Sequence, residues 1–186
     1  METAKSLRFP QAAAWKVSRL VEDPRDLVLA HYDREQLALR RYLLFLGMDM
    51  DSARETVQET FLRLHEHLLG NGDRTNLRAW LYRVAHNLAR NAQLAFHSRK
   101  TEPLPELAGH ADPAADMASA EEELLAREQI RRLRESMKQL SVAQRECLAL
   151  RSQGLKYREI AEALNLSVST VAENVQRGLG KLKELL

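Results

Sequence analysis

The residues best suited to recognition chemistry are polar and small side chains near the C-terminus. They share one side of a predicted helix and comprise Ser169, Thr170, Ala172, Glu173, Gln176 and Arg177, with Lys181 further along. Hydroxyl, amide, carboxylate and guanidinium groups read base edges in the DNA major groove. A glutamate can accept from cytosine N4, and an arginine can contact guanine. We therefore expect this helix face to contact duplex DNA.

The segment KYREIAEALNLSVSTVAENVQRGLGKL contains the elements that would position this face. A short helix over residues 157–164 would be followed by a sharp turn at Asn165, because asparagine tolerates the left-handed backbone better than most residues. Ser167 can cap the second helix. The apolar spacing predicts an inward stripe of Val168, Val171, Val175, Leu179 and Leu182. This arrangement is typical of a helix-turn-helix, whose second helix enters the major groove; a plain pair of packed helices is the alternative.

No pattern in the chain predicts covalent chemistry. His65 and His67 are two residues apart, so they lie on different helix faces, unlike a metal-binding pair at i and i+4. A nucleophile–base pair, a glycine-rich phosphate loop and a carboxylate dyad are all missing at recognisable spacing. Cys147, the single cysteine, is expected to be a buried small hydrophobe rather than a redox sensor. We expect no catalytic residues, metal or cofactor.

The remaining chain also shows helical periodicity and predicts an all-α fold. Asp23-Pro24 is typical of a capped helix start, and the helix that it begins is expected to end at Gly47. Two further helices are predicted, from near residue 51 to Gly70 and from Leu77 to about His97. Later, Ser141 and Gln144 match a capping box, and Gly154 is placed to end the helix that they begin.

Charge and proline content divide the chain into segments. Residues 1–100 and 136–186 carry net charges of +4 and +3, whereas residues 101–135 carry −5 and include three of the five prolines. We therefore expect two small helical domains joined by a flexible acidic linker; a long surface loop within one domain is the alternative. The predicted boundaries are an N-terminal extension over 1–22, a first domain over 23–100, a linker over 101–120 and a second domain over 121–186.

Two long motifs together carry a family resemblance. VQETFLRLHEHL followed by NLRAWLYRVAHNLARN, and then LSVAQRECLALRSQGLKYREIAEALNLSVSTVAENVQR beyond the linker, resemble an extracytoplasmic-function sigma factor. The resemblance covers roughly residues 25–186. It implies a non-enzymatic subunit that binds core RNA polymerase, recognises promoter −10 and −35 elements and assists strand opening. The first domain would contact the −10 element and polymerase, and the second the −35 element.

The resemblance also implies roles for individual side chains. The polar face of the second helix would bind polymerase through Arg54, Glu55, Gln58, Glu59 and Arg63. The loop at 70–76 and the helix after it would bind −10 DNA through Asn71, Asp73, Asn76, Arg78, Tyr82, Arg83, Asn87, Arg90 and Asn91. Gly72 would allow unusual backbone angles in that loop. Trp80 is expected in the core, and Tyr82 is left open between the core and base stacking.

This chain departs from the family pattern at the helix that reads the −35 element. Ala172 and Glu173 stand where a basic residue commonly follows the Thr-Val pair, so a familiar −35 sequence is not expected. Gly178 and Gly180 are poor helix formers, and we expect the helix to fray beyond Arg177, leaving Lys181 and Lys183 as looser phosphate contacts.

The resemblance also implies an anti-sigma partner. Neither an apolar run long enough to span a bilayer nor a signal-peptide pattern is seen, so we expect a cytoplasmic protein without membrane insertion. Two alternatives remain at this point: a helix-turn-helix regulator that binds its operator alone, and a helical adaptor or enzyme with a fortuitous motif. The first would carry a receiver or ligand domain with alternating strands and helices, a pattern that this chain lacks.

Overall fold

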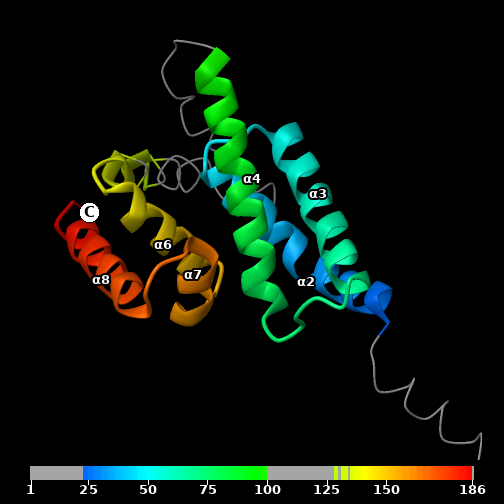
Figure 1. Cartoon of the computed structure of the whole chain (residues 1–186). Helices are drawn as coiled ribbons and strands as arrows, with labels where there is room; N and C mark the ends of the chain where they lie inside the picture. Colours follow the sequence, from blue (N-terminus) through cyan, green and yellow to red (C-terminus); the bar gives the residue numbers. More distant parts are fainter. Residues whose placement is uncertain (1–22, 100–127, 130, 134, 186) are drawn as a thin grey trace, which may run out of the picture.

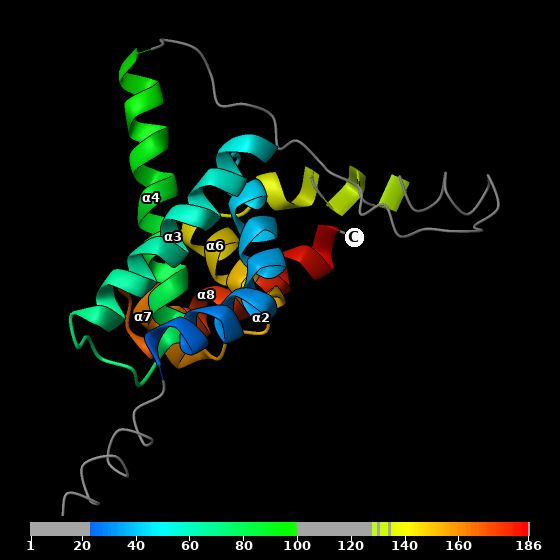
Figure 2. The same cartoon turned by 90° about the vertical axis from the view of Figure 1, so that its right-hand side faces the viewer.

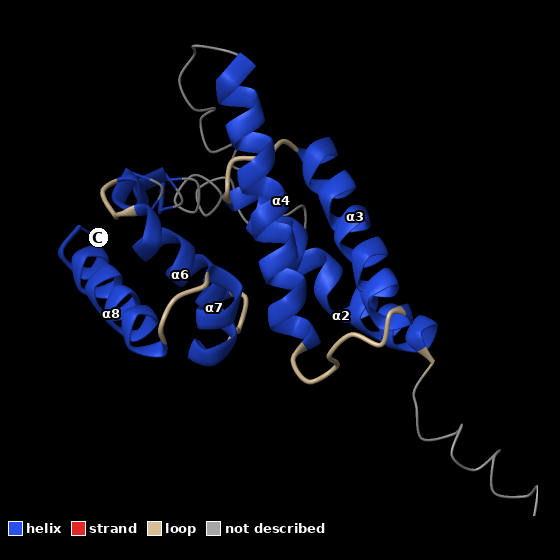
Figure 3. Ribbon diagram, viewed as in Figure 1, coloured by secondary structure: helices blue, strands red, loops and turns tan. Residues whose placement is uncertain are grey.

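The computed structural model describes residues 23–99, 128–129, 131–133 and 135–185, and all regular structure within these ranges is helical (Figure 3). The labelled helices are α2 (Pro24–Phe45), α3 (Met50–Leu69), α4 (Leu77–Arg99), α6 (Val142–Ser152), α7 (Tyr157–Leu164) and α8 (Val168–Leu185). The predicted all-α class is confirmed. The predicted N-terminal extension and acidic linker lie outside the described residues.

Capping groups set the helix starts in the first half of the chain. The Asp23 carboxylate accepts from the backbone N–H of Arg25 at 2.8 Å, with Pro24 in the first turn. Asp49 caps α3 by accepting from the N–H groups of residues 51 and 52. These bonds satisfy amide groups that have no partner inside the helix. These two helices and α4 pack around one apolar core, which includes Leu39 on α2, Leu64 on α3 and Leu81 on α4.

The second half contains the predicted helix-turn-helix. Ser141 and Gln144 form a reciprocal capping box at the start of α6, with distances of 3.0 and 3.2 Å. Gly154 follows the helix end with φ +83°. Asn165 has φ 54° between α7 and α8, as its side-chain type predicted. Val171 and Val175 on α8 are buried.

The two halves pack against each other. α4 contacts both α2 and α3 on one side and α7 on another, and α2 also reaches α6. Figure 1 shows α4 with α2 and α3 on one side and α7 on the other, and Figure 2 gives the perpendicular view. Leu39 and Leu81 therefore belong to the same apolar cluster as Leu150 and Ile160 from the second half. We call residues 23–99 the N-lobe and residues 135–185 the C-lobe.

Helix α8 differs from the sequence prediction in two respects. It continues to Leu185 instead of fraying beyond Arg177. Its buried row contains Gly178, whereas Val168 and Leu179, predicted to face inward, are exposed. A β-carbon at Gly178 would lie 2.8 Å from Cδ1 of Leu148. Because α6 approaches α8 closely at position 178, a glycine fits there, and Leu179 lies on the exposed side of the helix.

Candidate nucleic-acid and polymerase interfaces

The polar face of α8 is set up by its first turn. Ser167 Oγ accepts from the backbone N–H of Thr170 at 3.0 Å, which confirms the predicted cap. The same oxygen lies 2.8 Å from the Ser169 hydroxyl and 2.7 Å from that of Thr170. The hydroxyl groups of Ser169 and Thr170, which were predicted to read DNA, are therefore linked through Ser167 at the N-terminal end of the helix.

Most of the predicted reading residues on α8 face solvent. Ser169, Glu173, Gln176 and Arg177 are exposed, while Thr170 and Ala172 are half-buried. Glu173 and Arg177 form an ion pair one helical turn apart, with 2.5 Å between Oε1 and Nη2. Because both side chains are more than half exposed, this pair contributes little stability and is easily exchanged for other partners. A phosphate or a guanine edge could replace Glu173 as the partner of Arg177, and a cytosine N4 amine could replace Arg177 as the partner of Glu173.

Lys181 is exposed but has a contact within the C-lobe. Its ammonium donates to the backbone carbonyl of Gln139 at 2.6 Å, just before α6. Lys181 therefore joins the end of α8 to the start of the C-lobe. Sequence spacing alone gave no sign of this bond, because the two residues are 42 positions apart.

The α3–α4 loop, residues 70–76, has a defined helix-stop geometry. The N–H of Gly72 donates to the carbonyl of His67 at 2.8 Å, and that of Asn71 to the carbonyl of Leu68 at 3.2 Å. This is a Schellman motif, with Asn71 in the left-handed conformation at φ 56°. The expectation that Gly72 supplies unusual backbone angles is wrong, because the positive φ belongs to Asn71.

Within the same loop, Asp73 binds its own neighbours. One carboxylate oxygen accepts from the backbone N–H of Thr75 at 3.0 Å and the other from its hydroxyl at 2.8 Å. These hydrogen bonds lower the pKa of Asp73. Asn71 and Asp73 are both exposed, so the loop presents an amide and an ionised carboxylate to solvent.

The predicted −10 residues on α4 divide into two groups. Arg83, Asn87 and Asn91 follow at intervals of four and lie outside the fully buried face of the helix. The second group is directed to the rest of the fold and comprises Arg78, Tyr82 and Arg90, together with Asn76 at the helix start.

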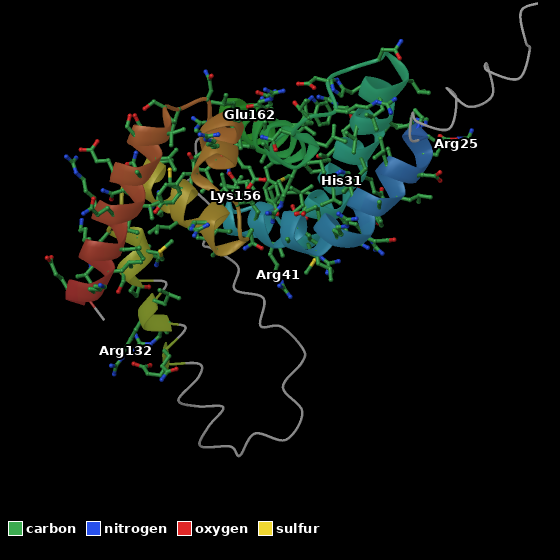
Figure 4. All side chains as sticks on the ribbon, turned by 90° about the horizontal axis from the view of Figure 1, so that it is seen from below. Arg25, His31, Arg41, Arg132, Lys156 and Glu162 are labelled. Carbon is green, nitrogen blue, oxygen red and sulfur yellow. The ribbon has the colours of Figure 1, made fainter. Side chains whose placement is uncertain are left out.

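Asn76 and Arg78 bond directly to the C-lobe. The amide of Asn76 donates to Oε2 of Glu162 at 2.6 Å, and Figure 4 shows Glu162 on α7 where that helix meets α4. The Arg78 guanidinium donates to the carbonyls of Gln153 at 2.7 Å and Gly154 at 3.2 Å. These bonds connect the start of α4 to the turn before the helix-turn-helix.

Arg78 also lies beside a buried carboxylate. Its Nε is 2.9 Å from Oε1 of Glu35 on α2, an ion pair in which the Nε–H itself makes no hydrogen bond. Tyr82 donates its hydroxyl to Oε2 of Glu35 at 3.3 Å and is fully buried. Tyr82 is thus a core residue in this arrangement, and its ring is not available to a base. The sequence analysis missed Glu35, although an acid at i−4 from the buried Leu39 was a usable signal.

A second polar group lies near the middle of α4, where a buried hydrogen bond joins α2 to α4 inside the N-lobe. The Tyr42 hydroxyl bonds Nδ1 of His86 at 2.8 Å, and both side chains are buried. Burial, with a smaller effect of Arg90, lowers the pKa of His86 to about 4. Arg90 itself lies 3.7 Å from Glu146 on α6. Its charge is therefore directed to the C-lobe.

Cys147 is fully buried, as expected of a small hydrophobe. Burial raises the pKa of its thiol to about 11. Within the described ranges, no three His, Cys, Asp or Glu side chains come together as a metal site.

The polar face of α3 is separate from both groups. Arg54, Glu55, Gln58 and Arg63 are exposed and Glu59 is half-buried, with an ion pair of 2.7 Å between Glu59 and Arg63. Leu62 lies among them and is 54% exposed. The sequence analysis missed Leu62, although an apolar residue at i+4 from Gln58 on a polar face was a detectable signal.

Family models match both lobes. The model for sigma-70 region 2 matches residues 31–99, and the model for sigma-70 region 4 matches residues 130–182. The chain is 32% identical over 158 residues to RNA polymerase sigma factor SigZ of Bacillus subtilis (strain 168), covering 83% of this chain and 84% of the relative. It is 28% identical over 168 residues to ECF RNA polymerase sigma factor EcfG of Rhodopseudomonas palustris (strain TIE-1), covering 90% and 87%.

Two solved structures share the fold. CnrH in complex with the cytosolic domain of CnrY matches with a TM-score of 0.60 at 23% identity, covering 93% of each chain. The sigma factor RpoE in complex with the anti-sigma factor NepR from Bartonella quintana matches with a TM-score of 0.64 at 21% identity, covering 87% of this chain and 96% of that one.

Proposed function

Given that this chain belongs to the extracytoplasmic-function family of RNA polymerase sigma factors, we propose that its lobes divide promoter recognition between them. As a sigma factor the protein is not an enzyme; it binds core RNA polymerase and promoter DNA and directs promoter-specific initiation. The observation that carries the division of labour is the presence in one chain, in order, of a region 2 lobe and a region 4 helix-turn-helix. This order also argues against a regulator that binds its operator alone.

We assign −35 recognition to the exposed face of α8. Four of its residues, Ser169, Glu173, Gln176 and Arg177, are exposed and could enter a major groove, and Thr170 and Ala172 flank them. Lys181 would contact phosphate after exchanging the Gln139 carbonyl for it.

The −10 element is assigned to the α3–α4 loop and the open row of α4. Asn71 and Asp73 offer groups for the edge of an unpaired base, while Arg83, Asn87 and Asn91 would hold the strand. Asn76 and Arg78 hydrogen-bond to the C-lobe in this arrangement, and we infer that they reach DNA only after the lobes separate. Arg90 pairs with Glu146 but is more than half exposed, so it can exchange that partner for a phosphate.

The polymerase contact is assigned to the exposed face of α3, with Leu62 as its apolar centre. An exposed leucine surrounded by charged and amide groups resembles the apolar core and polar rim of a protein interface. Leu62→Asp should weaken core binding at least about tenfold, whereas Leu29→Asp, on an equally exposed residue of α2, should not. Equal core affinity of the two variants would reject this assignment.

An anti-sigma partner is proposed as well, since RpoE of Bartonella quintana was solved in complex with the anti-sigma factor NepR. Within the described ranges, each helix is too short or too polar to cross a bilayer. We place the protein in the cytoplasm, where RNA polymerase acts.

Reconstitution with core polymerase from the source bacterium tests the proposal. Run-off transcription from a genomic library should produce discrete start sites with shared −10 and −35 sequences. Failure of the full chain to bind core polymerase, or start sites identical to those of core alone, would overturn it.

A further inference from the structure

The imidazole of His67 joins three parts of the N-lobe that are separate in sequence. His67 lies in the last turn of α3, and its Nε2 donates to the backbone carbonyl of Asp73 at 2.9 Å. Its ring stacks on Trp80 of α4, with 4.8 Å between ring centroids and 29° between planes. One side chain therefore contacts the end of α3, the middle of the loop and the first turn of α4.

Gly72 is the third contact of this ring. A β-carbon at position 72 would lie 2.2–2.4 Å from Cε1, Nδ1 and Nε2 of His67, closer than any real carbon could approach. Because Gly72 has no positive φ, its backbone would accept an alanine. The glycine is required by the ring and not by the chain conformation.

We propose that His67 is a positioning residue for −10 recognition. It holds the α3–α4 loop in the conformation that presents Asn71 and Asp73 to the unpaired base. Asn71 directly precedes Gly72, and Asp73 is the residue whose carbonyl His67 binds. Fixing this backbone before DNA arrives lowers the ordering cost of base capture and limits the bases that fit. The proposal rests on the assignment of this loop to the −10 element.

The test compares holoenzymes assembled on core polymerase and transcribing a promoter library with a randomised −10 element. His67→Ala should reduce discrimination at the captured base about fivefold to tenfold, the equivalent of one lost hydrogen bond. His65→Ala is the matched control, because His65 is a half-buried histidine of the same helix on another face. His67→Gln, which keeps an N–H donor, should recover part of the loss. Core binding and −35 duplex binding should stay unchanged in all three.

Gly72→Ala tests the contact between the His67 ring and Gly72 by changing the glycine instead of the histidine. Its methyl group should displace the imidazole and reproduce the loss seen with His67→Ala. The double variant should be no worse than His67→Ala alone, because the clash disappears with the ring. Losses that add in the double variant would overturn the role of the ring.

Asn71→Gly separates this inference from the assignment on which it rests. It removes the side chain while keeping a residue suited to the left-handed conformation. Lost discrimination in Asn71→Gly with normal discrimination in His67→Ala would reject the positioning role alone. Normal discrimination in Asn71→Gly would reject the −10 assignment of the loop, and the positioning role with it.

Discussion

Glu162→Ala should weaken the contact between the N-lobe and the C-lobe. The substitution leaves every residue assigned to DNA in place. The carboxylate of Glu162 accepts from the amide of Asn76 at 2.6 Å. A hydrogen bond to a charged group contributes about 1.5–3 kcal/mol, and the half-buried position of both residues favours the lower end. Losing about 1.5 kcal/mol changes the ratio of open to closed molecules about tenfold. If the closed form predominates, apparent affinity for −10 DNA rises by the same factor.

The assay is fluorescence anisotropy of a labelled single-stranded −10 oligonucleotide with the free sigma factor at fixed ionic strength. Removing a carboxylate also makes the protein more basic, which strengthens DNA binding by itself. Glu184→Ala is the matched control, because Glu184 is an exposed acid on α8 and its removal changes net charge equally. Glu162→Ala should bind about tenfold more tightly than Glu184→Ala.

Two results would refute this reasoning. Equal affinities of the two variants would show that the Asn76–Glu162 bond does not limit access to DNA. Weaker binding by Glu162→Ala than by wild type would show that Glu162 helps to form the DNA site instead of covering it. In the assembled holoenzyme, where polymerase and DNA hold the lobes, the variants should bind promoter alike.

Three further predictions concern stability and specificity. His86 has a folded pKa near 4, below its ordinary value, so the unfolded chain binds more protons between pH 6.5 and 4. As the pH is lowered from 6.5 to 4, the free energy of unfolding should therefore fall by roughly 2–3 kcal/mol. In denaturant titrations His86→Gln should show a flatter profile, and an unchanged slope would contradict the cause given. Gly178→Ala should be less stable than Gly180→Ala by about 1–3 kcal/mol, because both gain helix propensity but only the first meets Leu148; equal melting temperatures would show that Leu148 moves freely. Glu173→Ala should change base preference at one −35 position, measured by selection from randomised duplexes; a uniform effect on all sequences would reject its reading role.

The helix caps and the turn of the helix-turn-helix were predicted correctly from the sequence. Asp23, Ser141 and Ser167 cap the helices predicted for them, and Asn165 adopts the left-handed turn. Each of these depends on groups within a few positions of one another, so the residue types suffice to predict them. The predicted −10, −35 and polymerase residues remain assignments for experiment.

Errors arose where a distant element determined the outcome. Gly178, and not Leu179, faces inward because α6 crosses α8 at that point. Gly72 is required by the His67 ring and not by its own φ. For Tyr82, which the sequence left open between the core and base stacking, the packing of α2 against α4 decides for the core, where its hydroxyl donates to Glu35. Helix periodicity identifies a face but gives no information about the side chain that meets it.

The sequence by itself determined an all-α chain with a helix-turn-helix whose outward face carries polar groups, which we assign to DNA recognition. Helix caps, turn residues and apolar spacing act over short range, so they are readable before the chain is folded. Only the tertiary structure decided which polar residues of the N-lobe contact the C-lobe and which are exposed to solvent. Asn76 and Arg78 hydrogen-bond to the C-lobe and Arg90 pairs with Glu146 at the edge of the contact, whereas Asn71 and Asp73 face solvent away from it. The physical reason is that ion pairs and hydrogen bonds across 56 to 86 positions depend on how the helices pack, and no local pattern encodes that packing.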